Sequence, residues 1–224
     1  MKVKEVSIPV NDDAIIGDFN HPEEATKLVI FAHGSGSSRF SARNNAVAKF
    51  LREGHLGTLL FDLLTSDEER IDSVTREYRF DIPMLSQRLA STISWLSKQP
   101  EAADLPVGLF GSSTGAAAAL IVAARIPNQV AVVVSRGGRV DLAGDYLDKV
   151  EAPTLMIVGG VDYEVLRLNT AAREQIRGMS EIAVVDQASH LFEEPGALEQ
   201  VASLARDWFV KYLAARRLSD QTGS

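Results

Sequence analysis

The sequence predicts an α/β protein with a doubly wound, mostly parallel sheet of about eight strands and helices on both faces. Short apolar runs alternate with longer segments of helical periodicity, which is the pattern of β-α-β units. Most of these runs, such as "KLVIFA" and "VAVVVS", are apolar at consecutive positions, as in strands buried on both faces. The 224 residues, 46% of them hydrophobic, are enough for one core. We therefore expect a single domain over residues 1–217 and a disordered tail over 218–224.

The strands are expected in two groups, a leading hairpin and a parallel set. Residues 2–9 alternate in polarity, and the turn-forming residues "NDD" separate them from a second strand at 13–19, which predicts an antiparallel pair. The remaining strands are expected at 27–32, 57–62, 106–111, 130–135, 153–158 and 181–185.

Segments of helical periodicity lie between these strands and predict right-handed crossovers. They cover residues 41–53, 81–98, 114–125, 164–177 and 196–214. Two connections, 63–79 and 136–150, show no clear period, and we expect them to be long irregular loops. The acidic run at 67–70 is expected to be a solvated face that can border the site entrance.

Composition excludes several classes of function. The net charge is −7 and the basic residues are scattered, so no nucleic-acid partner is expected. The chain has no cysteine, which excludes disulfides and thiolate chemistry and is compatible with a reducing compartment. The N-terminus lacks the apolar region of a signal peptide, and the longest apolar run, 116–124, is too short to span a membrane. We expect a cytoplasmic protein without membrane contact, cofactor or metal.

The stretch "LFGSSTGAAAAL" at residues 109–120 places two serines between two glycines, after a strand and before a helix. Residues 111–115 match G-x-S-x-G, in which the central serine sits on a sharp, strained turn. The flanking glycines let the backbone pack closely there. Since ligands of such sheets bind at the carboxyl ends of the strands, Ser113 is the predicted nucleophile. An ordinary Gly/Ser loop is the alternative.

A serine hydroxyl needs a base to take its proton, and the chain has four histidines. His190 follows the last expected strand, from which it can reach over the sheet edge, and it is the predicted base. His21 and His55 lie in turns and are expected at the surface. His33 ends a strand and opens the loop "HGSGSS".

The base in turn needs a carboxylate that holds its tautomer. Asp162 lies beyond the strand expected at 153–158, after two glycines that allow a turn. The order Ser113, Asp162, His190 is that of nucleophile, acid and base in α/β-hydrolases. Asp186, four residues before His190, is the rival acid. We rank Asp162 ahead because of its strand end and glycine turn, and we expect Asp186 to pair locally or to face solvent.

Attack on a carbonyl also needs donors aimed at the developing oxyanion. The backbone N–H groups of Thr114, at the helix N-terminus, and Ser35, in the loop after the third strand, are the predicted donors. Gly34 and Gly36 shape that loop and are candidate substrate contacts. A phosphate cradle is disfavoured, because neither G-x-G-x-x-G nor Gly-Lys-Ser/Thr is present.

Three arginines are further candidates. Arg136 and Arg139 follow the sixth expected strand, so either can hold a substrate carboxylate through a bidentate pair. The slightly favoured alternative is that both pair within their own loop, with Asp141 or Asp145. Arg39 is expected to have a structural role in packing the loop after the third strand.

Several segments in this order resemble the dienelactone hydrolase-like family of α/β-hydrolases, over about residues 5–212. They are "FAHGSGSSRFSARN", "LLFDLLT", "LFGSSTGAAAAL", "VSRGGRVDLAG", "PTLMIVGGVD" and "ASHLFEEPG". The resemblance implies an α/β-hydrolase domain with a minimal cap or none, acting on small esters or lactones. Family members proper use a cysteine where this chain has Ser113, which favours ordinary acyl transfer over dienelactone hydrolysis. Some relatives are fused to a phosphoribosyltransferase domain, which this chain is not expected to carry.

The sequence therefore predicts a serine hydrolase that cleaves small-molecule carboxylic esters or lactones through an acyl-enzyme on Ser113. We expect a monomer or a homodimer. A thioesterase or amidase with the same triad is the alternative within this class. The alternative from another class is a non-catalytic α/β-hydrolase-fold protein that only binds a ligand, against which the three filled triad positions argue.

Overall fold

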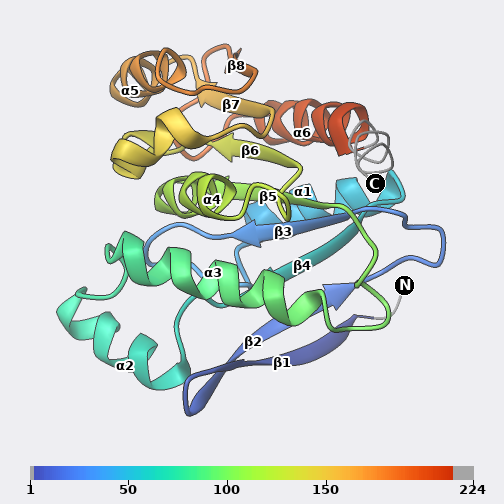
Figure 1. The fold of residues 1–224 in the computed structure, drawn as a ribbon. Helices are drawn as coiled ribbons and strands as arrows, with labels where there is room; N and C mark the ends of the chain where they lie inside the picture. The colour runs from blue at the N-terminus through green and yellow to red at the C-terminus, as the bar shows by residue number, and fades with distance from the viewer. Residues whose placement is uncertain (1–2, 214–224) are drawn as a thin grey trace.

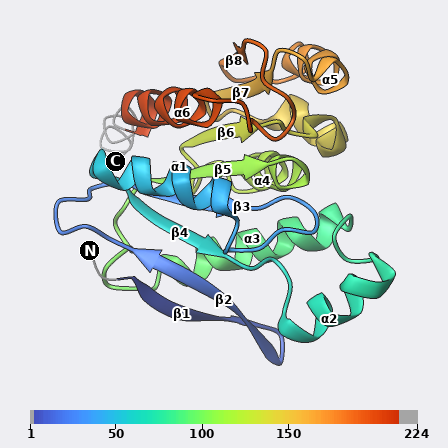
Figure 2. The same ribbon diagram turned by 180° about the vertical axis from the view of Figure 1, so that it is seen from behind.

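One eight-stranded sheet forms the middle layer of the molecule, between two layers of helices (Figure 1, Figure 2). The computed structural model describes residues 3–213. The strands lie in the order β1-β2-β4-β3-β5-β6-β7-β8. Their bounds are β1 (Lys4–Val10), β2 (Asp13–Asn20), β3 (Leu28–Ala32), β4 (Gly57–Phe61), β5 (Val107–Ser112), β6 (Val132–Arg136), β7 (Thr154–Gly159) and β8 (Ser180–Val185).

The strand directions confirm the predicted doubly wound sheet. β1 and β2 form the expected antiparallel hairpin, and β2 also pairs antiparallel with β4. All other neighbouring strands are parallel. The tail expected to be disordered, 218–224, lies outside the described residues. Because the six strands β3 to β8 run the same way, the residues that follow them gather along one edge of the sheet.

Each expected helix is present within a few residues of its predicted bounds. The helices are α1 (Ala42–Glu53), α2 (Ser66–Thr75), α3 (Ile82–Leu96), α4 (Thr114–Arg125), α5 (Tyr163–Arg173), α6 (Ala197–Leu213) and the 3₁₀ helix η1 (Val140–Lys149). α1 and α6 cover one face of the sheet, and α3, α4 and α5 cover the other (Figure 1, Figure 2). No helix within residues 3–213 is long and apolar enough to cross a membrane.

The prediction of an irregular loop at 63–79 is wrong, because this segment contains α2. The helix begins at a capping box, in which the Thr65 hydroxyl accepts the Glu68 N–H and the Glu68 carboxylate accepts the Thr65 N–H. Polar side chains cover nearly all of α2, so no apolar period marks it in the sequence. Glu68 also departs from the expected solvated face, since it forms an ion pair of 2.6 Å with the buried Arg88.

The second connection, 136–150, is also more regular than predicted. It contains η1, which is interrupted at Gly144, where φ is +51° and ψ is −131°. Val140, Ala143 and Leu147 are the buried side chains of η1. A short 3₁₀ helix with a break has no repeat long enough to be seen as helical periodicity, so the sequence pattern shows only a loop.

α4 is the central helix, and its small side chains set its distance from the sheet. Residues 116–119 are all alanines and are fully buried. Alanine allows the helix to lie close against β3, β5 and β6. Its N-terminus therefore points at the carboxyl edge of the sheet, where the candidate residues gather.

Candidate active site

Ser113 stands on a strained turn between β5 and α4. Its φ of 50° and ψ of −120° lie outside the regions that non-glycine residues normally occupy. The flanking glycines are required, because a Cβ on Gly115 would lie 2.2 Å from the Ala32 carbonyl oxygen and one on Gly111 2.5 Å from the Ala116 Cα. The Ser113 side chain is half-buried and makes no capping bond to α4, so its hydroxyl is presented at the sheet edge.

Ser112, the other serine of the pair, is held in the interior. Its hydroxyl donates a 3.0 Å hydrogen bond to the Asn44 side-chain oxygen, on the face of the sheet that α1 covers. The side chain is buried. Of the two neighbouring hydroxyls, only that of Ser113 remains at the sheet edge.

Asp162 and His190 come together at the ends of β7 and β8. His190 Nδ1 lies 2.6 Å from Asp162 Oδ2, a charge-assisted hydrogen bond in which the imidazole donates. The loop after β8 passes directly over the end of β7, since a Cβ on Gly159 would lie 2.3 Å from the Ala188 carbonyl oxygen. The rival acid, Asp186, is exposed, and none of the ion pairs within residues 3–213 involves it.

Gly137 lies between the nucleophile turn and the histidine. A Cβ on Gly137 would lie 3.4 Å from the His190 ring atoms Nδ1 and Cε1, so the ring packs over this residue. The preceding residue, Arg136, accepts the Ser113 N–H on its carbonyl oxygen at 3.2 Å. Among the hydrogen bonds of the described chain, none joins Ser113 Oγ to His190. The Asp162–His190 pair thus lies close to the residue that follows Arg136, without a hydrogen bond to Ser113 among the described residues.

His33 fixes the loop that follows β3. Its Nδ1 donates to the Gly34 carbonyl at 2.9 Å, and its Nε2 accepts the Leu63 N–H at 3.0 Å, so the ring is the neutral Nδ1–H tautomer. Burial lowers the pKa of His33 and supports this neutral form. The loop lies against the nucleophile turn, because a Cβ on Gly34 would come 3.0 Å from the Ser113 Cβ.

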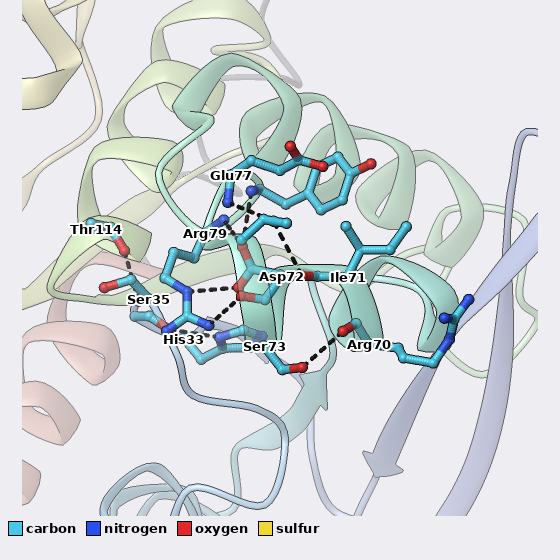
Figure 3. Close-up of polar contacts among 12 residues, drawn as sticks. His33, Ser35, Arg70, Ile71, Asp72, Ser73, Glu77, Arg79 and Thr114 are labelled. Carbon is cyan, nitrogen blue, oxygen red and sulfur yellow. Dashed lines mark hydrogen bonds and ion pairs between the residues drawn. The ribbon is translucent and has the colours of Figure 1, made fainter.

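The two predicted oxyanion donors are adjacent but are not equally available. The Ser35 N–H donates to the Thr114 hydroxyl oxygen at 2.9 Å (Figure 3). The Thr114 N–H, at the first position of α4, has no backbone or side-chain acceptor anywhere in the described part of the chain. Thr114 N–H is therefore a free donor beside Ser113, whereas Ser35 N–H is already engaged.

A partly buried ion pair between Arg79 and Asp72 braces the same loop. Arg79 Nε donates to Asp72 Oδ2 at 2.6 Å, and Arg79 Nη2 donates to the Asp72 carbonyl oxygen (Figure 3). Burial would raise the pKa of Asp72, but hydrogen bonds from Arg79 and Tyr78 outweigh it and lower the pKa. The guanidinium lies against Gly36, whose added Cβ would be 3.0 Å from Arg79 Nη1. No periodicity or motif marks either residue in the sequence.

A cavity of about 380 Å³ opens beside this loop, next to the N-terminus of α2. This volume lies within the range of small-molecule sites. Its lining combines hydroxyls, carboxylates and an exposed aromatic ring: His33, Ser37, Ser38, Phe40, Asp62, Leu64, Thr65, Ser66 and Glu69. Glu69, from the acidic run at 67–70, thus lies at the border of this cavity.

Two of the three candidate arginines, Arg39 and Arg139, form ion pairs with acidic side chains. Arg139 binds Asp141 through two hydrogen bonds, of 2.9 and 2.8 Å, as the favoured alternative predicts. Arg39 has the expected structural role, with its guanidinium between Asp62, Glu5 and Asp18.

For Arg136 the prediction of a partner in its own loop is wrong. Only 8% of this residue is exposed, and no hydrogen bond or ion pair of its side chain occurs among residues 3–213. Burial, together with the nearby Arg43, lowers the pKa of Arg136 to about 10, so the group remains charged at neutral pH. Arg136 is the cross-strand neighbour of Ser112, whose side chain lies on the face of the sheet that α1 covers.

The remaining histidines lie away from this site. His55 forms a 3.0 Å contact with Glu24 at the surface, and the half-buried His21 stacks on Phe19. The described residues contain no group of three or more histidine, aspartate or glutamate side chains arranged to hold a metal ion.

Comparisons with known proteins give one family match and several similar structures. Residues 89–195 match the family described as "BAAT / Acyl-CoA thioester hydrolase C terminal". The crystal structure of a dienelactone hydrolase from Anabaena variabilis is 50% identical, with a TM-score of 0.93 over 94% of this chain and 98% of that one. Est1E from Butyrivibrio proteoclasticus, 14% identical over 94% and 99% of the two chains with a TM-score of 0.77, shares the fold.

Proteins of two Mycobacterium tuberculosis strains, each named "Putative phosphoribosyl transferase", are 52% identical to this chain over 213 residues. The match covers 95% of this chain but 47% of theirs. The chain therefore spans about half the length of the curated relatives it matches.

Proposed function

Because the chain belongs to the dienelactone hydrolase-like family of α/β-hydrolases, we propose that it is a serine hydrolase of small carboxylic esters or lactones. The observation that carries the proposal is the strained turn that presents Ser113 beside the Asp162–His190 pair, whose nitrogen and oxygen are 2.6 Å apart. The name of the mycobacterial relatives describes chains about twice as long, and we assign phosphoribosyl transfer to the half that this chain does not match.

In the proposed reaction Ser113 Oγ attacks the acyl carbon while His190 Nε2 takes its proton. Asp162 holds the Nδ1–H and stabilises the imidazolium that forms. The Thr114 N–H, at the positive end of the α4 dipole, donates to the oxyanion. His190 then gives the proton to the leaving alkoxide, and a water molecule repeats the cycle on the acyl-enzyme.

The proposal is tested by labelling with a fluorophosphonate probe, which reacts with activated serines and needs no knowledge of the substrate. We expect one adduct per chain by intact mass, located by peptide mapping on Ser113 and not on Ser112, which Asn44 holds. A folded protein that takes up no probe would instead support the non-catalytic ligand-binding alternative.

A thioesterase is the second candidate, favoured by the match of residues 89–195 to the acyl-CoA thioester hydrolase family. Esters, thioesters and amides use the same nucleophile and oxyanion donors, so the site geometry does not separate them. Turnover of a matched oxygen ester, thioester and amide with the same acyl group distinguishes them, and we expect the oxygen ester to have the highest kcat/KM.

Arg136 supports a preference for substrates that carry an anionic group. It is a charged, buried guanidinium without an acidic partner, one strand from the nucleophile. An unpaired buried cation costs stability, which a bound anion would offset. We therefore propose that Arg136 binds an anionic group of the substrate.

Replacing Arg136 with methionine is expected to lower kcat/KM about 10- to 100-fold for a carboxylate-bearing ester, such as mono-p-nitrophenyl succinate. Turnover of neutral p-nitrophenyl acetate should change little. The melting temperature should stay the same or rise, because the substitution removes an unpaired buried charge. Arg139→Met is the matched control, since that arginine already binds Asp141. An equal loss for both esters in Arg136→Met, or a marked fall in its melting temperature, would contradict the assignment.

A further inference from the structure

Asn169 is a fully buried polar side chain of α5 that the proposed reaction does not use. Its relative exposure is 0%, and its amide nitrogen donates two hydrogen bonds of 2.8 Å. One bond goes to the Val165 carbonyl in the same helix, and the other goes to the Gly138 carbonyl. The second bond joins α5 to the segment that follows β6, 31 positions away in the chain.

This segment, residues 136–139, holds the backbone of the nucleophile on both sides. The Arg136 carbonyl accepts the Ser113 N–H at 3.2 Å, and the Arg139 N–H donates to the Ser113 carbonyl at 3.0 Å. The strained backbone of Ser113, with φ of 50°, is therefore fixed by one short segment. A displacement of the segment would turn Ser113 and move its hydroxyl.

The same segment lies against the predicted base. An added Cβ on Gly137 would lie 3.4 Å from the His190 ring atoms Nδ1 and Cε1, which is van der Waals contact. The Gly137 N–H donates to the Ile157 carbonyl at 2.8 Å and ties the segment to the end of β7. Residues 136–139 therefore contact the nucleophile and the base at once.

Packing alone does not explain an asparagine at this position. Asn169 Oδ1 has no hydrogen-bond partner among the described residues, and a buried polar atom without a partner costs stability. The bond to Val165 does not need an amide either. In α3 the hydroxyls of Ser86 and Thr92 each donate to the carbonyl four residues earlier. What the amide adds is a second N–H, and this one is donated to Gly138.

We infer that Asn169 is a positioning residue, which holds the segment 136–139 through its amide. The orientation of Ser113 and the place of the His190 ring then depend on this bond. α5 thereby has two roles, because Asp162 is its N-cap residue and Asn169 lies about two turns further on. The helix links the acid to the segment that contacts the nucleophile and the base. The inference rests on the proposed hydrolase function.

The test compares Asn169→Leu with Asn169→Ser. Leucine has a similar volume and donates no hydrogen bond, whereas a serine hydroxyl has one proton and can keep only the helix bond to Val165. We expect kcat for p-nitrophenyl acetate to fall about 10- to 100-fold in both variants, because the reacting groups are displaced. KM should change little, since Asn169 contacts no substrate. Fluorophosphonate labelling of Ser113 should slow by a similar factor.

Thr170→Ala is the matched control for both variants. Thr170 is the next residue of α5, it is exposed, and its hydroxyl donates to the Leu166 carbonyl at 2.8 Å. The substitution removes the same kind of helix bond without touching residues 136–139. We therefore expect wild-type kcat and a wild-type labelling rate in Thr170→Ala.

The division between kcat and stability distinguishes positioning from a merely structural role. A structural role would lower the melting temperature but leave kcat of the folded protein unchanged. Wild-type kcat in both Asn169 variants would therefore overturn the inference, as would a loss that disappears well below the melting transition. A loss in Asn169→Leu alone would also overturn it, because the bond to Val165 would then suffice. If Asn169→Leu does not fold, Asn169→Ser decides the question, since it keeps that bond.

These outcomes are separate from failure of the proposed function. A wild-type chain that neither reacts with the probe nor hydrolyses any ester refutes the hydrolase proposal itself. A wild-type chain that does both, with the Asn169 variants behaving like wild type, refutes only the role of Asn169.

Discussion

Ser113→Ala is expected to lose ester turnover by at least about four orders of magnitude in kcat, together with all fluorophosphonate labelling. Alanine keeps the Cβ and removes only the oxygen that would attack the acyl carbon. The Ser113 hydroxyl makes no capping bond to α4, so its removal should leave the melting temperature close to that of the wild type. Turnover and intact mass after labelling check the loss of activity, and a thermal melt checks that the fold is unchanged.

Ser112→Ala is the matched control for this prediction. Its hydroxyl is bonded to Asn44 and buried, so the substitution leaves one amide oxygen without a donor. We expect a loss of about 1–2 kcal/mol in stability and retention of labelling. If Ser113→Ala still reacted with the fluorophosphonate probe and Ser112→Ala did not, Ser112 would be the nucleophile instead.

Asp162→Asn should lower kcat about 10³- to 10⁴-fold, the second largest effect that we expect. An amide at this position no longer stabilises the imidazolium, and its NH₂ group can favour the wrong tautomer of His190. Asp162 makes no capping bond to α5, so the free energy of unfolding should change little. The measurement is kcat for a simple ester together with the midpoint of a denaturant melt.

Asp186→Asn is the control that separates the two candidate acids. This carboxylate is exposed and lies four residues before the same histidine. We expect wild-type turnover in Asp186→Asn. If Asp186→Asn instead lost turnover and Asp162→Asn kept it, the acid would have to be Asp186. The 2.6 Å contact between Asp162 and His190 would then be only structural.

The sheet could be predicted from the sequence because each buried strand carries its own signal. The run "LVIFA" in β3, for example, is buried along its whole length, so it is apolar without interruption. α2 could not be predicted in the same way. Its one buried residue is the polar Asp72, and its start depends on the capping box at Thr65, a local signal without a hydrophobic period.

The order of motifs along the chain suggested which residues could meet, but not which donors would be free. Asp162 and His190 follow strands that lie side by side, and parallel strands bring their ends to one edge. The engagement of Ser35 by the Thr114 hydroxyl is a contact over 79 positions, which no local pattern encodes. The same holds for Arg136, whose lack of a partner is visible only when the packing around it is known.

The position of β8 has a consequence for how the molecule responds to heat. β8 is an outermost strand, it is only partly covered, and His190 follows five residues after it ends. Strands at an open border exchange their amide protons through local opening that leaves the rest of a domain folded. Such opening would separate His190 from Ser113 while β3, β5 and β6 stay intact. Inactivation should therefore precede the loss of far-ultraviolet circular dichroism during a slow temperature ramp, and hydrogen exchange should be faster in residues 180–185 than in the central strands.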